Sequence, residues 1–231
     1  MLAFIVIIVL SYLIGSIPSS VWVGKLTKGV DIREHGSGNA GATNTFRVLG
    51  WKAGTVVSLI DIAKGFVAAF YISQIGFVLG EMPEVLWGVW ELDTTMRIVA
   101  GVAAVIGHMY PLYAGFKGGK GVITAAGMLY GIEPLSISLA LSVFLIILFT
   151  SRYVSLASII ATLSYPIFLI SLRYFFGFSE IDGSLMVLSG AISLFIVIKH
   201  RGNIKRLIDG NENRIKSFAP AKGKLNEEQS A

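Results

Sequence analysis

Three short polar segments combine glycines with hydroxyl, amide and basic side chains, and each has the composition of an anion site. The first reads GSGNAGATNTFR and ends at Arg47. Its small residues let backbone N–H groups converge on an anion, and a guanidinium binds phosphate through two parallel hydrogen bonds. The residues that we expect to contact a ligand here are Gly36, Ser37, Gly38, Asn39, Thr43, Asn44 and Arg47.

This segment matches G-x-G-x-x-G in form, and Asp61 follows Gly41 by 20 residues. A dinucleotide site needs a surrounding βαβ unit, whereas Asp61 lies in an apolar run. We therefore exclude that fold. A flexible turn between two helices is the simpler alternative. It explains the glycines, but not four amide and hydroxyl side chains followed by Arg47.

The second segment comprises GHMYP at 107–111 and FKGGKG at 116–121. It is not a Walker A loop, because its spacing is one residue short and Gly121 stands where Ser or Thr should bind magnesium. Lysines among glycines before an apolar helix suit a phosphate; the alternative is a basic topology signal. His108 either packs between helices or acts in catalysis. The candidate phosphate contacts are Lys117, Gly118, Gly119 and Lys120.

The third segment reads HRGNIKRL from His200, and Glu212 follows shortly after it. His200 and Asn203 are spaced i, i+3 and share a helix face, which favours a site over lipid adhesion by basic residues alone. We expect a short interfacial helix within 198–216. Its apolar face would hold Ile204, Leu207 and Ile208, with Lys205 and Arg206 beside the headgroups.

Two further features lie in apolar runs. Asp61 and Lys64 are also spaced i, i+3, and we expect a structural ion pair that faces the bundle interior, since charges inside a membrane are costly. The serines of RYVSLAS at 152–158 are typical of helix packing.

The elements that position these segments must be membrane helices. Hydrophobic residues make up 54% and charged residues 14% of 231 residues, and the mean hydropathy is +0.73, whereas soluble domains carry roughly 25% charged residues. The chain has no cysteine and only three histidines, so we expect no metal site. The fold class that follows is an all-α, polytopic integral membrane bundle.

Seven apolar runs set the layout, at 2–23, 53–79, 97–114, 121–132, 136–150, 153–176 and 184–199. The fourth is short for a bilayer core of about 30 Å, so 121–150 is either two spans or a re-entrant hairpin. The first run lacks a basic start and a cleavage site, and we do not interpret it as a signal peptide. We expect one domain over 1–216 and a polar, disordered cytoplasmic tail over 217–231.

Loop charges predict the orientation, because Lys and Arg collect on the cytoplasmic side. Basic residues predominate in 24–52, 115–120 and 199–231, whereas 80–96 and 177–183 hold only acidic charges. About seven spans, with the N-terminus outside and the C-terminus inside, place every basic segment inside. Three cationic patches then lie on one face next to the bilayer, which indicates a phosphorylated, partly lipidic substrate.

Together the segments resemble the bacterial acyl-phosphate:glycerol-3-phosphate acyltransferases, the PlsY family. Its motifs G-S-G-N-x-G-A-T-N-x-x-R, G-H-x-x-P with F-K-G-G-K-G, and H-R-x-N-I-x-R-L-x-x-G-x-E occur in order up to about residue 214. The resemblance implies acyl transfer from acyl phosphate to the 1-hydroxyl of glycerol 3-phosphate, giving lysophosphatidic acid and phosphate as the first step of phospholipid synthesis. It also implies no cofactor or metal, the bacterial inner membrane as location, and a functional link to the enzyme that makes acyl phosphate.

The resemblance also suggests roles. Ser37, Arg47 and Lys120 would orient phosphates, and Gly118 and Gly119 would let glycerol 3-phosphate approach the backbone. His200 and Asn203 would align the acceptor hydroxyl. The general base is either His200 or a substrate phosphate, and Ser37 as an acyl-enzyme nucleophile is disfavoured because no activating base lies nearby. Ser158 would add a polar contact, with His108 and Glu212 as structural residues near the site.

A transporter for an organic phosphate is the rival interpretation from another class. Against it, the polar residues gather on one face rather than at the midplane, and the chain has no internal repeat. A passive lipid-binding scaffold is a third alternative. It predicts that Arg47 and Lys120 can each be removed with only graded loss of binding.

Overall fold

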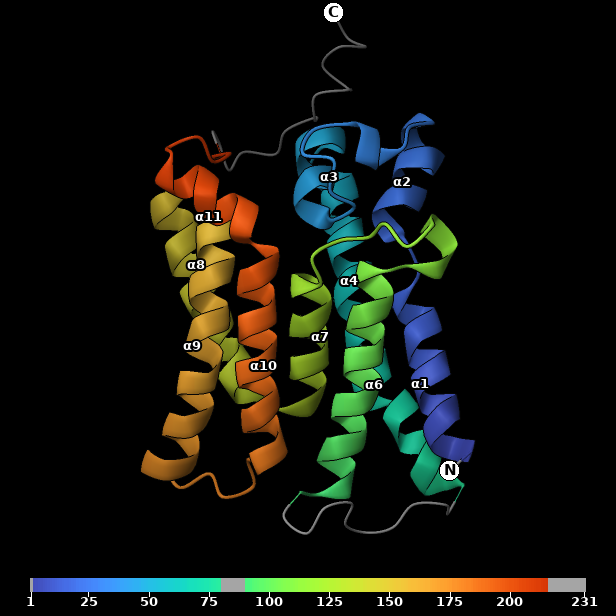
Figure 1. Cartoon of the computed structure of the whole chain (residues 1–231), viewed down its shortest axis with the longest axis vertical. Helices are drawn as coiled ribbons and strands as arrows, with labels where there is room; N and C mark the ends of the chain where they lie inside the picture. Colours follow the sequence, from blue (N-terminus) through green and yellow to red (C-terminus); the bar gives the residue numbers. More distant parts are fainter. Residues whose placement is uncertain (1, 80–89, 216–231) are drawn as a thin grey trace, which may run out of the picture.

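The computed structural model describes residues 2–79 and 90–215, which fold into a helical bundle (Figure 1). Each of the seven apolar runs lies in one or more helices, so the all-α expectation is confirmed. The expected disordered tail from residue 217 lies outside the described residues, as does most of the acidic segment 80–96.

The first apolar run is broken, contrary to the expectation of one helix over 2–23. It forms α1 (Leu2–Gly15) and α2 (Ser19–Lys28). Pro18 precedes α2 and has no N–H to donate to a preceding turn, so it ends one helix and starts the next. The chain then continues through η1 (Ile32–Glu34) to α3 (Ala42–Leu49).

The next two runs form the centre of the bundle. Residues expected at 53–79 make α4 (Trp51–Phe70), η2 (Ile72–Gln74) and α5 (Ile75–Val78). The run expected at 97–114 forms α6 (Leu92–Met109) and then η3 (Leu112–Ala114). It begins before residue 97 because Asp93 favours the first turn of a helix and pairs with Arg97 one turn later.

The short run forms α7 (Val122–Ile132), which packs along α4 at backbone contact. A side chain on Gly65 of α4 would overlap the carbonyl of Thr124, and one on Gly127 would overlap the carbonyl of Ile62. Small residues at such crossings are what membrane helices use to pack closely. The 11 residues of α7 rise only about 16 Å, so its C-terminal end lies within the bundle.

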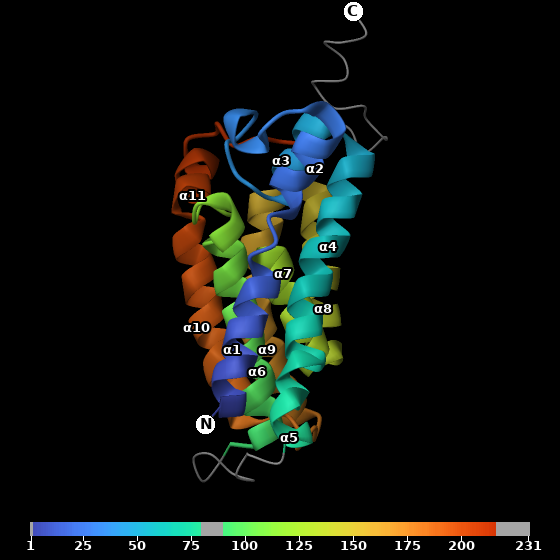
Figure 2. The same cartoon turned by 90° about the vertical axis from the view of Figure 1, so that its right-hand side faces the viewer.

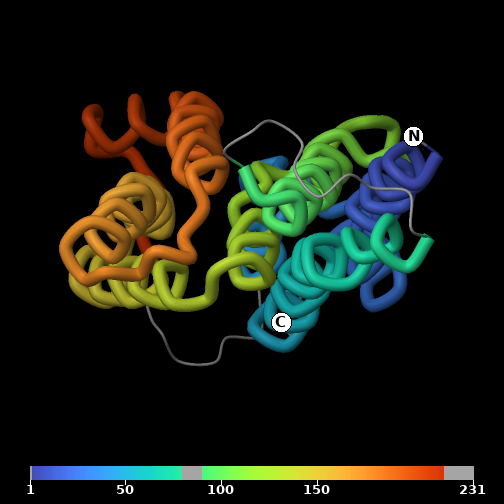
Figure 3. The backbone as a smooth tube through the Cα atoms, turned by 90° about the horizontal axis from the view of Figure 1, so that it is seen from below, coloured from blue at the N-terminus to red at the C-terminus, as the bar shows by residue number. Residues whose placement is uncertain are grey.

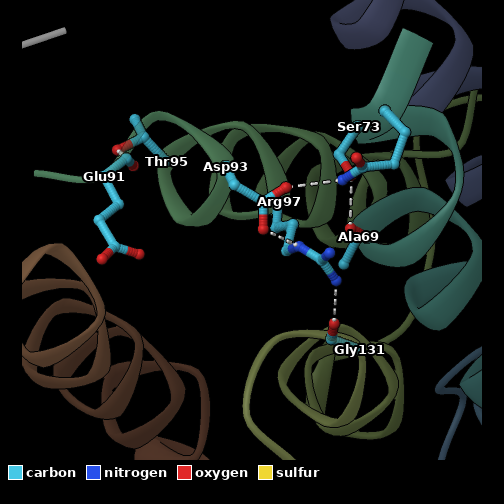
Figure 4. A network of polar contacts seen from close by, with 8 residues as sticks. Ala69, Ser73, Glu91, Asp93, Thr95, Arg97 and Gly131 are labelled. Carbon is cyan, nitrogen blue, oxygen red and sulfur yellow. Dashed lines mark hydrogen bonds and ion pairs between the residues drawn. The ribbon is translucent and has the colours of Figure 1, made fainter. Parts of the chain in front are cut away.

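Arg97 holds that end of α7 (Figure 4). Its Nη1 donates to the carbonyl of Gly131 at 3.0 Å, while its Nε lies 2.7 Å from Oδ2 of Asp93. The other oxygen of Asp93 accepts from Gln74 of η2 at 2.8 Å. The helix terminus, which would leave carbonyls unsatisfied in an apolar setting, is therefore tied to α6 and η2.

The remaining helices are α8 (Pro134–Ser151), α9 (Val154–Phe175), α10 (Gly183–Lys199) and α11 (Arg201–Ile208). Five candidate spans, Leu2–Lys28, Trp51–Val78, Leu92–Ala114, Pro134–Ser151 and Val154–Phe175, are long and apolar enough to cross a membrane. The pair α10 and α11, bent by 58°, is a sixth candidate. The seventh segment, α7, falls short of the usual length.

The bundle has two helix groups that lie side by side (Figures 1 and 3). One contains α1 to α7 and the other α8 to α11. The three polar segments lie at the end formed by α2, α3 and α11, whereas the N-terminus and α5 lie at the opposite end (Figure 2). Among the described residues, the basic segments 24–52, 115–120 and 199–215 thus lie at one end of the bundle and the acidic segment 177–183 lies at the other.

Candidate active site

Asn44 organises the first polar segment. Its side-chain amide donates to the carbonyls of Ile32 and His35 at 3.0 and 2.9 Å, and its Oδ1 accepts from the backbone N–H of Ser37 at 2.9 Å. Asn44 is 1% exposed. Because these bonds occupy the amide, the structure shows Asn44 shaping the loop from beneath.

Several other predicted residues of this loop face outward. The side chains of Ser37 and Thr43 are exposed, Asn39 is half-buried, and Gly36 and Gly38 have φ values of +63° and +73°. A side chain on Gly36 would overlap Oδ1 of Asn44, so the loop needs glycine there. Arg47, one turn after Asn44 on α3, is half-buried and directs Nη1 to Oδ1 of Asn44 at 3.5 Å.

The second polar segment folds back on the end of α6. The backbone N–H of Gly118 donates to Met109 at 3.1 Å, and that of Gly119 donates to His108 at 3.2 Å. Both N–H groups are therefore used within the chain. A side chain on Gly119 would overlap Nε2 of His108. The structure thus gives these glycines a packing reason, which differs from the expected approach of substrate to their backbone.

Lys120 links the two helix groups. Its Nζ donates to Oδ1 of Asn203 on α11, and Nδ2 of Asn203 donates to Oε1 of Glu212 at 2.8 Å. Glu212 also accepts from Ser155 at 3.1 Å and pairs with Nε of Arg206 at 2.7 Å. Arg206, expected beside the headgroups, is 44% exposed and pairs with this carboxylate at the edge of the site.

The cluster is strongly cationic. Burial lowers the pKa of Arg47; Glu212 opposes this shift and Arg206 adds to it. Burial likewise lowers the pKa of Lys120, with the same opposing effects of Glu212 and Arg206. Within residues 2–79 and 90–215, Arg206 forms an ion pair with Glu212, and Arg47 and Lys120 lie within electrostatic reach of the same carboxylate. The excess of positive charge can attract an anion.

His200 lies at the junction of α10 and α11, outside both helices, and is 3% exposed. Its Nδ1 is 2.8 Å from the carbonyl of Ile196. A carbonyl only accepts, so the neutral ring carries its proton on Nδ1 and keeps a lone pair on Nε2. Burial lowers the pKa of His200, and the neighbouring Lys120 lowers it further.

Four predicted residues lie apart from this cluster. Ser158 donates to Val154 of its own helix at 2.9 Å, and Ser155 contacts Glu212 instead. Gly38, Lys117 and Gly118 line a separate cavity of about 680 Å³ that Arg47, Lys120 and His200 do not line. The structure thus divides the predicted residues between two places.

Sequence reasoning missed Asp31 and Arg33, which it counted only as loop charges. Arg33 pairs with Asp31 through Nη2 at 2.7 Å and donates from Nη1 to the carbonyl of Ala114 at 2.7 Å. The Arg33 hydrogen bonds hold the pKa of Asp31 down at about 2. This clamp joins the first loop to η3. Its one signal in the sequence was an acid–base pair beside the glycine-rich loop.

The described part of the chain contains no group of three or more His, Cys, Asp or Glu side chains arranged for a metal ion. The cluster itself offers guanidinium, ammonium, amide and imidazole groups. Such groups can bind a phosphate and hold a hydroxyl beside a neutral imidazole.

Comparison with curated proteins gives close relatives along almost the whole chain. A relative from Salinibacter ruber, named glycerol-3-phosphate acyltransferase, is 47% identical over 222 residues, covering 95% of this chain and 96% of its own. One from Chlorobaculum tepidum with the same name is 47% identical over 234 residues, covering 93% and 97%.

Comparison with solved structures leads to the same kind of enzyme. The crystal structure of PlsY, an integral membrane glycerol 3-phosphate acyltransferase, in its glycerol 3-phosphate form has a TM-score of 0.75 and 38% identity, covering 92% of this chain and 95% of that chain. The lysophosphatidic acid form gives 0.73 and 37%. The integral membrane class is thereby confirmed, and the acyltransferase interpretation is favoured over the transporter. With a family model described as glycerol-3-phosphate acyltransferase matching residues 5–210, the chain belongs to the glycerol-3-phosphate acyltransferase (PlsY) family.

Proposed function

We propose that this enzyme transfers a fatty acyl group from acyl phosphate to the 1-hydroxyl of glycerol 3-phosphate. The products are 1-acyl-glycerol 3-phosphate and phosphate, in the first step of phospholipid synthesis. The glycerol 3-phosphate and lysophosphatidic acid forms of PlsY support the acceptor and product. We place the reaction on the cytoplasmic face of the bacterial inner membrane, because the basic loops share one end of the bundle.

One observation carries the proposal: at the polar end of the bundle Glu212 pairs with Arg206 and holds Asn203, the residue to which Lys120 donates, while Arg47 lies within electrostatic reach of the same carboxylate. A phosphate monoester carries a charge of about −1.5 to −2 at neutral pH. It therefore matches the charge that Glu212 leaves uncompensated. Both substrates bring a phosphate, and the exposed Ser37 and half-buried Asn39 add polar groups beside the cluster.

The reaction itself needs little more than positioning and charge stabilisation. The 1-hydroxyl oxygen attacks the carbonyl carbon of the acyl phosphate and forms a C–O bond. The bond from that carbon to the phosphate oxygen then breaks, and phosphate leaves with the electron pair. In this proposal Arg47 and Lys120 stabilise the negative charge that develops on the departing phosphate.

His200 and Asn203 align the acceptor in this proposal. Nε2 of His200 offers the lone pair that a hydroxyl needs to donate to, since Nδ1 is committed to Ile196. Asn203 is fixed by its bonds to Lys120 and Glu212. The hydroxyl proton passes either to Nε2 or to a phosphate oxygen of the substrate, whose second pKa is about 6. The proposed reaction also implies a second enzyme, which forms the acyl phosphate that this one consumes.

The test is a product assay on the purified chain in lipid nanodiscs. Labelled glycerol 3-phosphate would be supplied with palmitoyl phosphate, with palmitoyl-CoA, or with no donor, each with and without chelator. Lysophosphatidic acid formed from palmitoyl phosphate alone, unaffected by chelator, is the expected result. Product from palmitoyl-CoA alone would overturn the donor assignment, and no product from either donor in a folded sample would overturn the proposed reaction.

A further inference from the structure

A buried ion pair lies beneath the polar end of the bundle, outside the cluster described above. Nζ of Lys64 is 2.9 Å from Oδ1 of Asp61, and these side chains are only 3% and 1% exposed. The expected interior ion pair is thus present. Charges inside an apolar helix are costly and are generally retained for a function, and the proposed chemistry uses neither of them.

The pair holds the break between α1 and α2. Ser19, the first residue of α2, donates its hydroxyl to Oδ1 of Asp61 at 2.6 Å. Nζ of Lys64 donates to the carbonyl of Ile17 at 3.1 Å. Both ends of the broken run are therefore tied to α4, and α2 leads directly into the first polar loop.

The same carboxylate faces the second polar loop through His108. Nδ1 of His108 lies 3.6 Å from Oδ1 of Asp61. The opposite nitrogen of the ring, Nε2, lies against Gly119, the residue before Lys120. A side chain on Gly119 would also come within 3.0 Å of the carbonyl of Ala40 in the first loop. His108 therefore supports the place where the two loops meet.

We infer that Asp61 and Lys64 are positioning residues that set the separation of the two substrate-binding loops. Through Ser19 and Ile17 they fix the start of α2, and through His108 they fix Gly119. The quantity that they control in this inference is the distance between Arg47 and Lys120, on which the binding of phosphate depends. The inference rests on the proposed function, because it assigns both cations to the same anion.

A purely structural ion pair makes a different prediction. Replacing a buried pair by apolar residues of similar size is often neutral for stability, whereas removing one partner is strongly destabilising. The variant Asp61→Leu with Lys64→Met therefore removes the positioning contacts while the bundle stays folded. The matched control is Asp93→Leu with Arg97→Met, which removes an ion pair at the opposite end of the bundle in the same way.

The experiment measures KM for glycerol 3-phosphate, kcat and Tm on the full chain in nanodiscs. We expect the Asp61→Leu, Lys64→Met variant to raise KM at least tenfold with Tm within about 5 °C of the parent. The control should leave KM within twofold, whatever its effect on Tm. His108→Gln should raise KM in the parent but change it less than twofold in the pair-free variant, since coupled residues are not additive.

A second readout needs no activity. The chain has three histidines, so ¹⁵N-histidine NMR can follow His108 directly. Losing the carboxylate should change the tautomer signals of His108 and leave those of His35 unchanged. If the parent makes no product while this change occurs, the proposed function fails and the contact with His108 stands.

Ser19→Ala covers the case in which the pair-free variant does not fold. It removes one hydrogen bond to Asp61 and should raise KM about threefold with little loss of Tm. Unchanged KM in a folded pair-free variant would overturn the inference. An effect of His108→Gln on KM that is as large in the pair-free variant as in the parent would also overturn it. If only Ser19→Ala folds, a KM for Ser19→Ala equal to that of the parent would overturn the inference.

Discussion

Lys120 donates a hydrogen bond to Oδ1 of Asn203, and this contact joins the helix group that contains α7 to the group that contains α11. The amide orientation of Asn203 is fixed from its other side, because Nδ2 donates to Glu212. The ammonium of Lys120 is thereby held by an amide of fixed orientation, at a place where Arg206 adds a second positive charge, and this arrangement suits an anion.

Lys120→Met should lower kcat/KM for acyl transfer by about 10²- to 10³-fold, the usual loss when a preorganised charge at a reacting phosphate is removed. Lys52→Met is the matched control, because Lys52 is exposed at the same end of the bundle and its Nζ lies over the Trp51 ring, 6.0 Å from the ring centroid. Equal losses in both variants would show that only the general positive potential matters.

His200→Ala should lower kcat by more than tenfold if His200 accepts the proton, since general-base catalysis is usually worth 10²–10⁴. A smaller loss assigns the proton to the substrate phosphate. Because burial lowers the pKa of His200, the ring stays neutral below pH 6.5, and activity should fall only as pH drops through that lowered pKa. This acid limb should vanish in His200→Gln and persist in His35→Gln.

Asn44→Ala should destabilise the first loop by about 1–3 kcal/mol, because three backbone groups, one of them buried and two part-buried, lose their partner. Asn44→Asp keeps the acceptor for Ser37 and loses the two donors, so its loss should be intermediate. Thermal unfolding and the KM for glycerol 3-phosphate should change in the same order. Equal effects of the two substitutions would contradict the assignment of the donors.

Gly119→Ala should raise KM for glycerol 3-phosphate and lower Tm, because the added methyl group would overlap the imidazole of His108. Gly190→Ala on α10 is the matched control, since nothing lies within 4 Å of the added atom. It should be neutral or slightly stabilising in the helix. Steady-state kinetics and a thermal scan on both variants measure these changes in KM and Tm. Equal changes in the two variants would contradict the role given to Gly119.

Arg97→Met should lower the free energy of unfolding by about 1 kcal/mol, because the carbonyl of Gly131 and the carboxylate of Asp93 lose a partly buried partner. Asp93→Asn should cost less, since it can still accept from Gln74. Kinetic constants measured well below Tm should stay within threefold of the parent. A loss of activity without loss of stability would place Arg97 in the catalytic machinery.

The helices were predictable from sequence because long apolar runs leave few alternatives in a membrane. The break at Pro18 was missed because the apolar composition continues across it. The early start of α6 was missed because Asp93 and Arg97 are charged, and their pairing appears only once the helix has formed.

The site was predictable as a set of residue types, and its connections were not. The glycine-rich motif identifies a loop, but only the fold shows that the side chain of Asn44 closes it. The contact of Glu212 with Ser155 joins residues 57 positions apart, and that of Lys120 with Asn203 joins residues 83 apart. No local spacing reports such distances, because they depend on how α9 and α11 pack.

The division of the site between two helix groups also affects when the site is completed during synthesis of the chain. His200, Asn203 and Glu212 follow α10, so they leave the ribosome after every other helix of the bundle has been made. A chain halted during membrane insertion carries Arg47 and Lys120 but lacks their partners on α11. We therefore expect activity only from a chain that has been completed through residue 212, and no activity from unfinished chains in the membrane.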